Sequence, residues 1–175
     1  ITLISFILRS VYLYKTIHLL TRDKSLAFLA MVISLTMPLN FIFGKILFSE
    51  PAVVACIIIS IYHMLKWKTT GKSSSFILAF VFFALGLLLK PPAMYTLLPL
   101  LYIYYLKKES LRPKIYLRFA GAFLLAVIPA ALWYGYAYHI SNVSIDVFGV
   151  FGGHNKFQTL TMLSEPAWWV IMLGR

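Results

Sequence analysis

The chain consists of long apolar runs separated by short polar and basic segments. The apolar positions are continuous rather than alternating, which predicts membrane helices and argues against the period-two pattern of a membrane β-barrel. Six runs can be delimited, and a crossing of the bilayer needs about 20 residues. The pattern therefore predicts an all-α, polytopic transmembrane helical bundle with about six spans. The runs are Ile1–Leu20, Ser25–Phe43, Pro51–Leu65, Ser75–Leu89, Pro91–Leu106 and Ile115–Tyr138.

One lysine interrupts the longest apolar stretch. Lys90 is the only charged residue between Ser73 and Leu106, and Pro91 and Pro92 follow it directly. Because proline has no backbone N–H and disfavours a helical residue before it, we predict that the helix breaks at Lys90. A lysine at such a turn either anchors a helix end by reaching the headgroups or binds an anionic group such as a lipid phosphate.

Composition places the chain in the membrane. Charged residues make up 12% of the sequence and hydrophobic residues 61%, whereas a soluble domain carries about 25% charged residues. The net charge of +11 would suggest nucleic acid as a partner of a soluble protein. Here the cations cluster in short loops between apolar runs, so membrane lipid is the expected partner and nucleic acid is excluded. A single cysteine, Cys56, rules out an internal disulfide.

The basic loops predict an orientation. One set of alternate loops carries ten basic residues and the other set carries three, so the richer set is predicted to be cytoplasmic. We therefore expect a multi-pass protein of the plasma (inner) membrane, with Lys90 on the periplasmic or extracellular side. The richer set comprises Arg22, Lys24, Lys66, Lys68, Lys72, Lys107, Lys108, Arg112, Lys114 and Arg118, and the poorer set comprises Lys45, Lys90 and Lys156.

The sequence also predicts two parts. Residues 1–138 form the transmembrane helical core, and residues 139–175 form an outer-side loop followed by the start of a further interfacial or membrane helix. Glu165 and Pro166 suit the first turn of that helix. Trp168 and Trp169 suit the membrane interface.

Polar residues expected on the outer side are candidates for a site. Glu50, with Lys45 nearby, is either part of an ordinary interfacial loop or a carboxylate that orients a polar substrate or a partner lysine. His154 and Lys156 follow two glycines and belong either to a solvated loop or to a binding site. No paired acids, glycine-rich phosphate loop, HExxH or CxxC motif is present in the sequence. We therefore identify no cofactor and no metal site, and leave a role for a divalent metal open.

Three short segments carry a family resemblance. They are Gly44-Lys45 … Ser49-Glu50-Pro51, then Gly86-Leu-Leu-Leu-Lys90-Pro91-Pro92, and then Leu97-Leu-Pro-Leu100. Their layout resembles polyprenyl-phosphate-sugar-dependent glycosyltransferases of the GT-C superfamily, in particular the dolichyl-phosphate-mannose protein mannosyltransferase-like family that includes the lipid A aminoarabinose transferases. The resemblance covers roughly Ser5 to Phe157.

The resemblance implies an enzyme that transfers a sugar from a polyprenyl-phosphate carrier to a protein, lipid or glycan acceptor on the outer face of the membrane, with inversion. It assigns the carrier phosphate to Lys90, with Lys156 as a second cation, and substrate orientation to Glu50, Lys45 and His154. Such enzymes place their catalytic aspartate in the first outer loop, which we expect to lie upstream of Ile1. No catalytic residue is therefore assigned here, and we expect these residues alone to be inactive.

A transporter or flippase component for a lipid-linked or anionic substrate is the alternative. Discontinuous helices often line transport sites, so Lys90 at a helix break fits that class as well. A transporter should carry charges near the middle of its spans, whereas the clear charges here are predicted at one outer plane. A structural membrane subunit without a site is a third interpretation.

Overall fold

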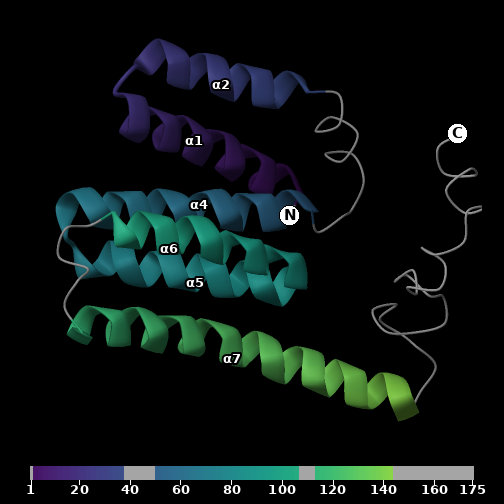
Figure 1. The fold of residues 1–175 in the computed structure, drawn as a ribbon. Coiled ribbons are helices and arrows are strands. Elements are labelled where there is room, and N and C mark those ends of the chain that lie inside the picture. Colours follow the sequence, from purple (N-terminus) through teal and green to yellow (C-terminus); the bar gives the residue numbers. More distant parts are fainter. Residues whose placement is uncertain (1, 38–49, 107–112, 144–175) are drawn as a thin grey trace, which may run out of the picture. The chain divides into compact units, whose positions relative to one another are not determined.

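The computed structural model describes residues 2–37, 50–106 and 113–143, and these stretches are almost entirely helical (Figure 1). The all-α class predicted from the sequence is confirmed, and each of the six predicted apolar runs contains at least one helix. The elements are α1 (Thr2–Thr21), α2 (Lys24–Thr36), α4 (Glu50–Thr70), α5 (Ser73–Leu89), the 3-10 helix η1 (Pro91–Thr96), α6 (Leu97–Tyr105) and α7 (Pro113–Val143).

Three of these helices are long and apolar enough to cross a membrane, over Leu3–Thr21, Glu50–Thr70 and Tyr116–His139. Two shorter apolar helices cover Lys24–Thr36 and Ser73–Leu89. The protein is a helical bundle of the membrane class.

Tight turns reverse the chain between α1 and α2 and between α4 and α5. The Asp23 carboxylate caps α2 by accepting hydrogen bonds from the backbone N–H groups of Ser25 at 2.8 Å and Leu26 at 3.2 Å. Gly71 adopts a φ of 71° directly after α4, a left-handed conformation that ends helices and that glycine adopts without steric cost. Both turns lie in segments where the sequence places a basic loop.

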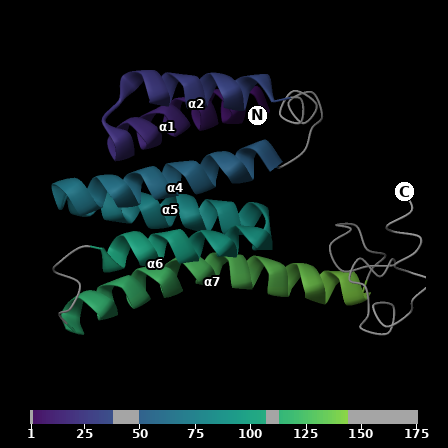
Figure 2. The same cartoon turned by 45° about the horizontal axis from the view of Figure 1, so that its top comes forward.

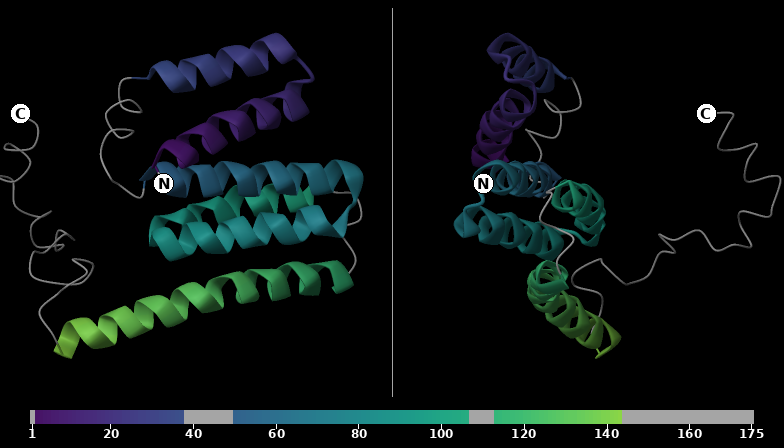
Figure 3. Two further views of the ribbon diagram at one scale, coloured as in Figure 1. Left: turned by 180° about the vertical axis from the view of Figure 1, so that it is seen from behind. Right: turned by 60° about the vertical axis from the view of Figure 1, so that its left-hand side comes forward.

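Helix α4 has the most neighbours in the described part of the bundle, because it packs against α1, α5, η1 and α6 (Figures 2 and 3). The most deeply buried large side chains lie at these contacts. They are Ile59 and Met64 of α4, Phe83 of α5 and Leu100 of α6. The Ser60 hydroxyl donates a hydrogen bond of 2.7 Å to the Ala79 carbonyl oxygen on α5. Close packing and such bonds hold membrane helices together, since lipid gives no hydrophobic drive for helices to associate.

Helix α7 joins the bundle through aromatic rings. The ring centre of Phe119 lies 5.2 Å from that of Phe80 on α5 and 4.6 Å from that of Tyr104 on α6. The opposite face of α7 is apolar and exposed, with Leu117 at 76% and Leu124 at 58%. Such a face matches lipid rather than water.

Several helix boundaries differ from the predicted runs. Helix α4 continues past Leu65 to Thr70, and α7 covers Pro113–Val143, which extends the predicted Ile115–Tyr138 at both ends. The chain divides into two compact units, residues 1–131 and 132–175. The predicted outer loop and the further helix near Glu165 fall largely on residues 144–175, outside the described residues.

Candidate functional site at the end of α5

The break at Lys90 is present as predicted. Helix α5 ends at Leu89, and Lys90 itself is extended, with φ −154° and ψ 132°. Its N–H donates a 3.0 Å hydrogen bond to the Gly86 carbonyl, and its own carbonyl accepts one of 3.1 Å from Ala93. Pro91 then opens η1, because a proline fits the first turn of a helix that it cannot continue.

Glu50 meets Lys90 at this end of the bundle. Glu50 is the first residue of α4, and its Oε1 accepts a hydrogen bond from the Lys90 Nζ in an ion pair. The start of α4 and the end of α5 lie at the same end of the described bundle (Figure 1). Each charge also suits its helix terminus, because the start of a helix favours an anion and the end favours a cation.

Small residues bring the two helix ends together. A Cβ atom built on Gly86 would lie 3.4 Å from the Ala93 Cβ and 3.5 Å from the Cys56 Cβ. Helices α4 and α5 and the turn η1 therefore meet where their side chains are smallest, as membrane helices commonly do. This packing fixes the backbone on both sides of Lys90.

The ion pair remains open to a ligand. The side chains of Lys90 and Glu50 are 39% and 37% exposed. A lysine ammonium has three donors, of which Glu50 takes one. The Oε2 of Glu50 is buried and has no hydrogen-bond partner among the described residues. Lys90 thus has donors left for an anion, whereas the Glu50 Oε2 is covered by protein and faces no solvent.

Comparison with known protein families adds to this geometry. A family model described as dolichyl-phosphate-mannose-protein mannosyltransferase matches residues 1–133. The chain belongs to this family. The GT-C resemblance predicted from the sequence is confirmed, and the protein is a membrane glycosyltransferase of that type. No curated protein and no solved structure matches the chain.

The remaining predicted site residues of this mannosyltransferase-family protein are not placed. Lys45, His154 and Lys156 lie outside the described residues, so their predicted roles stay predictions. Within residues 2–37, 50–106 and 113–143, no group of three or more His, Cys, Asp or Glu side chains could hold a metal ion.

Two buried polar residues were not singled out from the sequence as site candidates. Arg9 on α1 is only 6% exposed, and its guanidinium donates to the Ser34 carbonyl at 3.4 Å and lies 4.8 Å from the Phe6 ring centre. His63 on α4 is only 8% exposed, with the rings of Tyr12 and Phe82 beside it. It lies two turns before the end of α4, because that helix continues past Leu65. Ionisable residues inside spans are the sequence signal for such positions.

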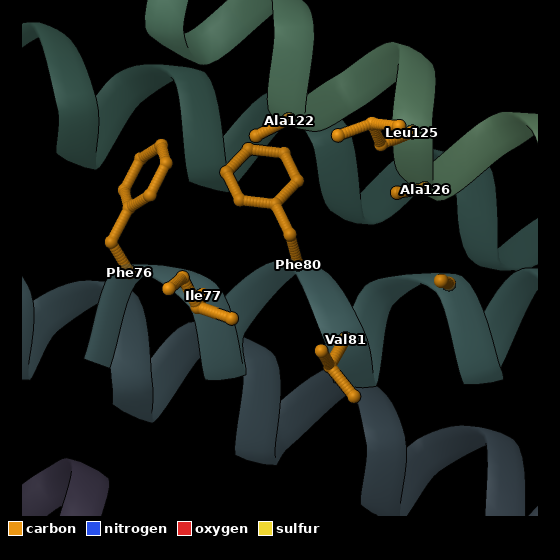
Figure 4. A pocket seen from close by; sticks show the side chains of 8 residues that line it. Phe76, Ile77, Phe80, Val81, Ala122, Leu125 and Ala126 are labelled. Atoms are coloured by element: carbon orange, nitrogen blue, oxygen red, sulfur yellow. The ribbon is translucent and has the colours of Figure 1, made fainter. Parts of the chain in front are cut away.

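An apolar pocket of about 250 Å³ opens between α5 and α7 in this family member (Figure 4). The rings of Phe76 and Phe80 extend from α5 toward α7, where Ala122 and Ala126 leave space. The pocket begins at the N-terminal end of α5 and reaches Ala84, and it contains no charged side chain. It suits a hydrocarbon chain rather than a polar reactant.

Proposed function

We propose that the protein transfers a sugar from a polyprenyl-phosphate carrier, and that Lys90 binds the carrier phosphate on the outer side of the plasma membrane. The observation that carries the proposal is the position of Lys90 at a broken helix end. Its side chain is half-exposed, and Glu50 uses only one of its three N–H donors. The description of the matched family names a lipid-phosphate sugar as donor and a protein as acceptor. A donor of that class, and a protein, lipid or glycan acceptor, fit this chain.

The proposed reaction is an inverting displacement. The acceptor hydroxyl oxygen attacks the anomeric carbon from the face opposite the phosphate, and the bond between that carbon and the phosphate oxygen breaks. The bonding electron pair leaves with the phosphate, and the hydroxyl proton passes to a general base. Negative charge therefore grows on the phosphate, where a positioned cation stabilises the transition state more than the ground state. Lys90 fills that role.

A transport function is the second candidate, and Arg9 is the observation that favours it. A cation buried inside a span is typical of a pathway for an anionic substrate. Proteoliposomes that contain the intact protein distinguish the two functions. A transferase releases free carrier phosphate from polyprenyl-phosphate mannose only when an acceptor is present, whereas a transporter moves the labelled lipid between leaflets without breaking it.

The test of the proposed function is Lys90→Gln in the intact membrane protein. We expect transfer from polyprenyl-phosphate mannose to fall by about 100-fold, because one charge-assisted contact to the leaving phosphate is lost. The matched control is Lys72→Gln, which removes the same charge from an exposed lysine at the opposite end of α5. Near-normal transfer by Lys90→Gln, with normal expression and melting temperature, would remove Lys90 from the phosphate site.

A further inference from the structure

The charge balance of the Glu50–Lys90 pair has a consequence for product release. The two side chains contact each other through Oε1 and Nζ, so the pair itself carries no net charge before a ligand binds. Binding a phosphate at Lys90 therefore brings the ligand close to a carboxylate as well as to an ammonium. The two charges act on the ligand with opposite sign.

The proposed reaction changes the charge of the ligand. The donor is a phosphodiester with one negative charge, and the spent carrier is a phosphomonoester that approaches two negative charges above its second pKa of about 6. A site with Lys90 alone would bind the spent carrier more tightly than the donor, so the product would block the enzyme. A nearby carboxylate opposes this preference, because it repels a dianion twice as strongly as a monoanion.

We propose that Glu50 is a specificity-determining residue that weakens the binding of spent carrier phosphate more than the binding of the sugar donor. The inference rests on the proposed function, since it requires the phosphate to bind at Lys90. Glu50 then promotes exchange of product for donor without contacting the sugar or the acceptor.

The fold keeps Glu50 near Lys90 when a ligand binds. Glu50 begins α4, where the positive end of the helix dipole stabilises its carboxylate. Close packing of Gly86 against Cys56 and Ala93 holds α4, α5 and η1 at a fixed spacing. The carboxylate can release Lys90 by a rotamer change, but its backbone stays within side-chain reach of the phosphate.

Two lipid probes test the proposal without knowledge of the sugar. Polyprenyl monophosphate stands for the spent carrier, and polyprenyl methyl phosphate, a diester, stands for the donor. Binding of each to the intact protein in nanodiscs is measured at pH 8 and low ionic strength. For Glu50→Gln we expect tighter binding by about threefold for the diester and about tenfold for the monoester, as one unit charge about 6 Å away predicts in a water-like medium.

The variant set separates the two proposals. Glu50→Gln keeps the size and hydrogen-bonding atoms of the side chain and removes its charge, whereas Glu50→Asp keeps the charge and should keep the wild-type ratio of affinities. Asp23→Asn removes the same charge from the N-cap of α2, a helix that packs on α1 and not on α4, keeps a capping side chain, and should also leave the ratio unchanged. If Glu50→Gln does not fold, Glu50→Ala serves as the second neutral variant.

Each outcome decides between defined alternatives. Monoester binding that tightens more than diester binding in the neutral Glu50 variants supports the inference. Equal changes for both probes, or weaker binding of either, overturn it and make Glu50 a residue that only holds Lys90 in place. Binding of both probes that Lys90→Gln leaves unchanged overturns the proposed function itself.

Discussion

The two ends of α5 hold their cations in different ways. At its C-terminal end, Lys90 contacts the Glu50 carboxylate, and neither side chain is more than about two-thirds buried. At its N-terminal end, Arg118 from α7 lies over the ring of Phe76, with 4.9 Å between the guanidinium carbon and the ring centre, and donates a 3.0 Å hydrogen bond to the Ser73 hydroxyl. One cation is neutralised by a carboxylate, and the other keeps its charge on an aromatic face.

The same difference extends to other cations at the end where α4 finishes. The ammonium of Lys15 lies 4.9 Å from the ring centre of Tyr12, and that of Lys66 lies 5.9 Å from the ring centre of Tyr62. A ring contact fixes a cation without cancelling its charge, so this end retains the positive excess that sets orientation in a membrane. A carboxylate cancels the charge until an anion competes for it. The comparison indicates that ring-held cations anchor the protein and that the carboxylate-held cation binds a ligand.

The largest expected effect concerns the side of the membrane on which each end of α5 lies. In a Cys56→Ala background, which removes the single native cysteine, we place one cysteine at Lys72 or at Pro92, both of which are exposed. A membrane-impermeant maleimide should label the Pro92 position only in right-side-out vesicles and the Lys72 position only in inside-out vesicles. Labelling of both positions from one side would contradict the predicted orientation and the contrast between the ends.

The next effect concerns how the ion-pair end is assembled. Gly86→Leu places a bulky side chain where a Cβ already meets Ala93 at 3.4 Å and Cys56 at 3.5 Å, so α4, α5 and η1 must separate. Overpacking of this kind costs about 1–3 kcal/mol of stability. We expect a lower melting temperature in detergent and a loss of transfer, because Lys90 shifts away from Glu50. Gly86→Ala is the control, since ordinary van der Waals contacts accommodate its methyl group.

If Gly86→Leu instead melts at the wild-type temperature and transfers normally, close packing does not position Lys90. The helix start at Glu50 and the helix end at Lys90 would then have to position the ion pair without that packing. Normal stability with reduced transfer in Gly86→Leu would show that the substitution displaces Lys90 without separating the helices.

Much of the fold could be predicted from hydrophobic pattern and proline chemistry. The break at Lys90 follows from two prolines that cannot continue a helix, and the helix start at Glu50 follows from the Glu-Pro pair. Loop charge predicted that both residues lie on one side. Their separation by 40 positions hides the contact, since the contact depends on how α4 and α5 pack.

Other features depend on packing that a single sequence does not reveal. From the sequence alone, Gly86 is one glycine in an apolar helix. Its role in close packing becomes visible only with its neighbours Cys56 and Ala93. Arg9 and Lys15 both interrupt the first run, yet Arg9 is buried while Lys15 lies on a tyrosine ring. Periodicity places such residues on faces of one helix, but the neighbouring helices decide which face is covered.

The smallest expected effect comes from the ring-held end. Arg118→Gln removes the same unit of charge as Lys90→Gln, but it replaces a cation over Phe76 and a donor to Ser73. An exposed cation–π contact contributes about 0.5–1 kcal/mol, so the melting temperature should fall slightly. Transfer and the binding of both phosphate probes should stay within about twofold of wild type, since α5 has 17 residues and a unit charge about 25 Å away changes the binding of a monoanion by only about 0.2 kcal/mol in a water-like medium. A loss of transfer comparable with that of Lys90→Gln would mean that the carrier phosphate is not bound selectively at the ion-pair end. In that case the N-terminal end of α5, with Arg118 and Lys72, would become the candidate phosphate site.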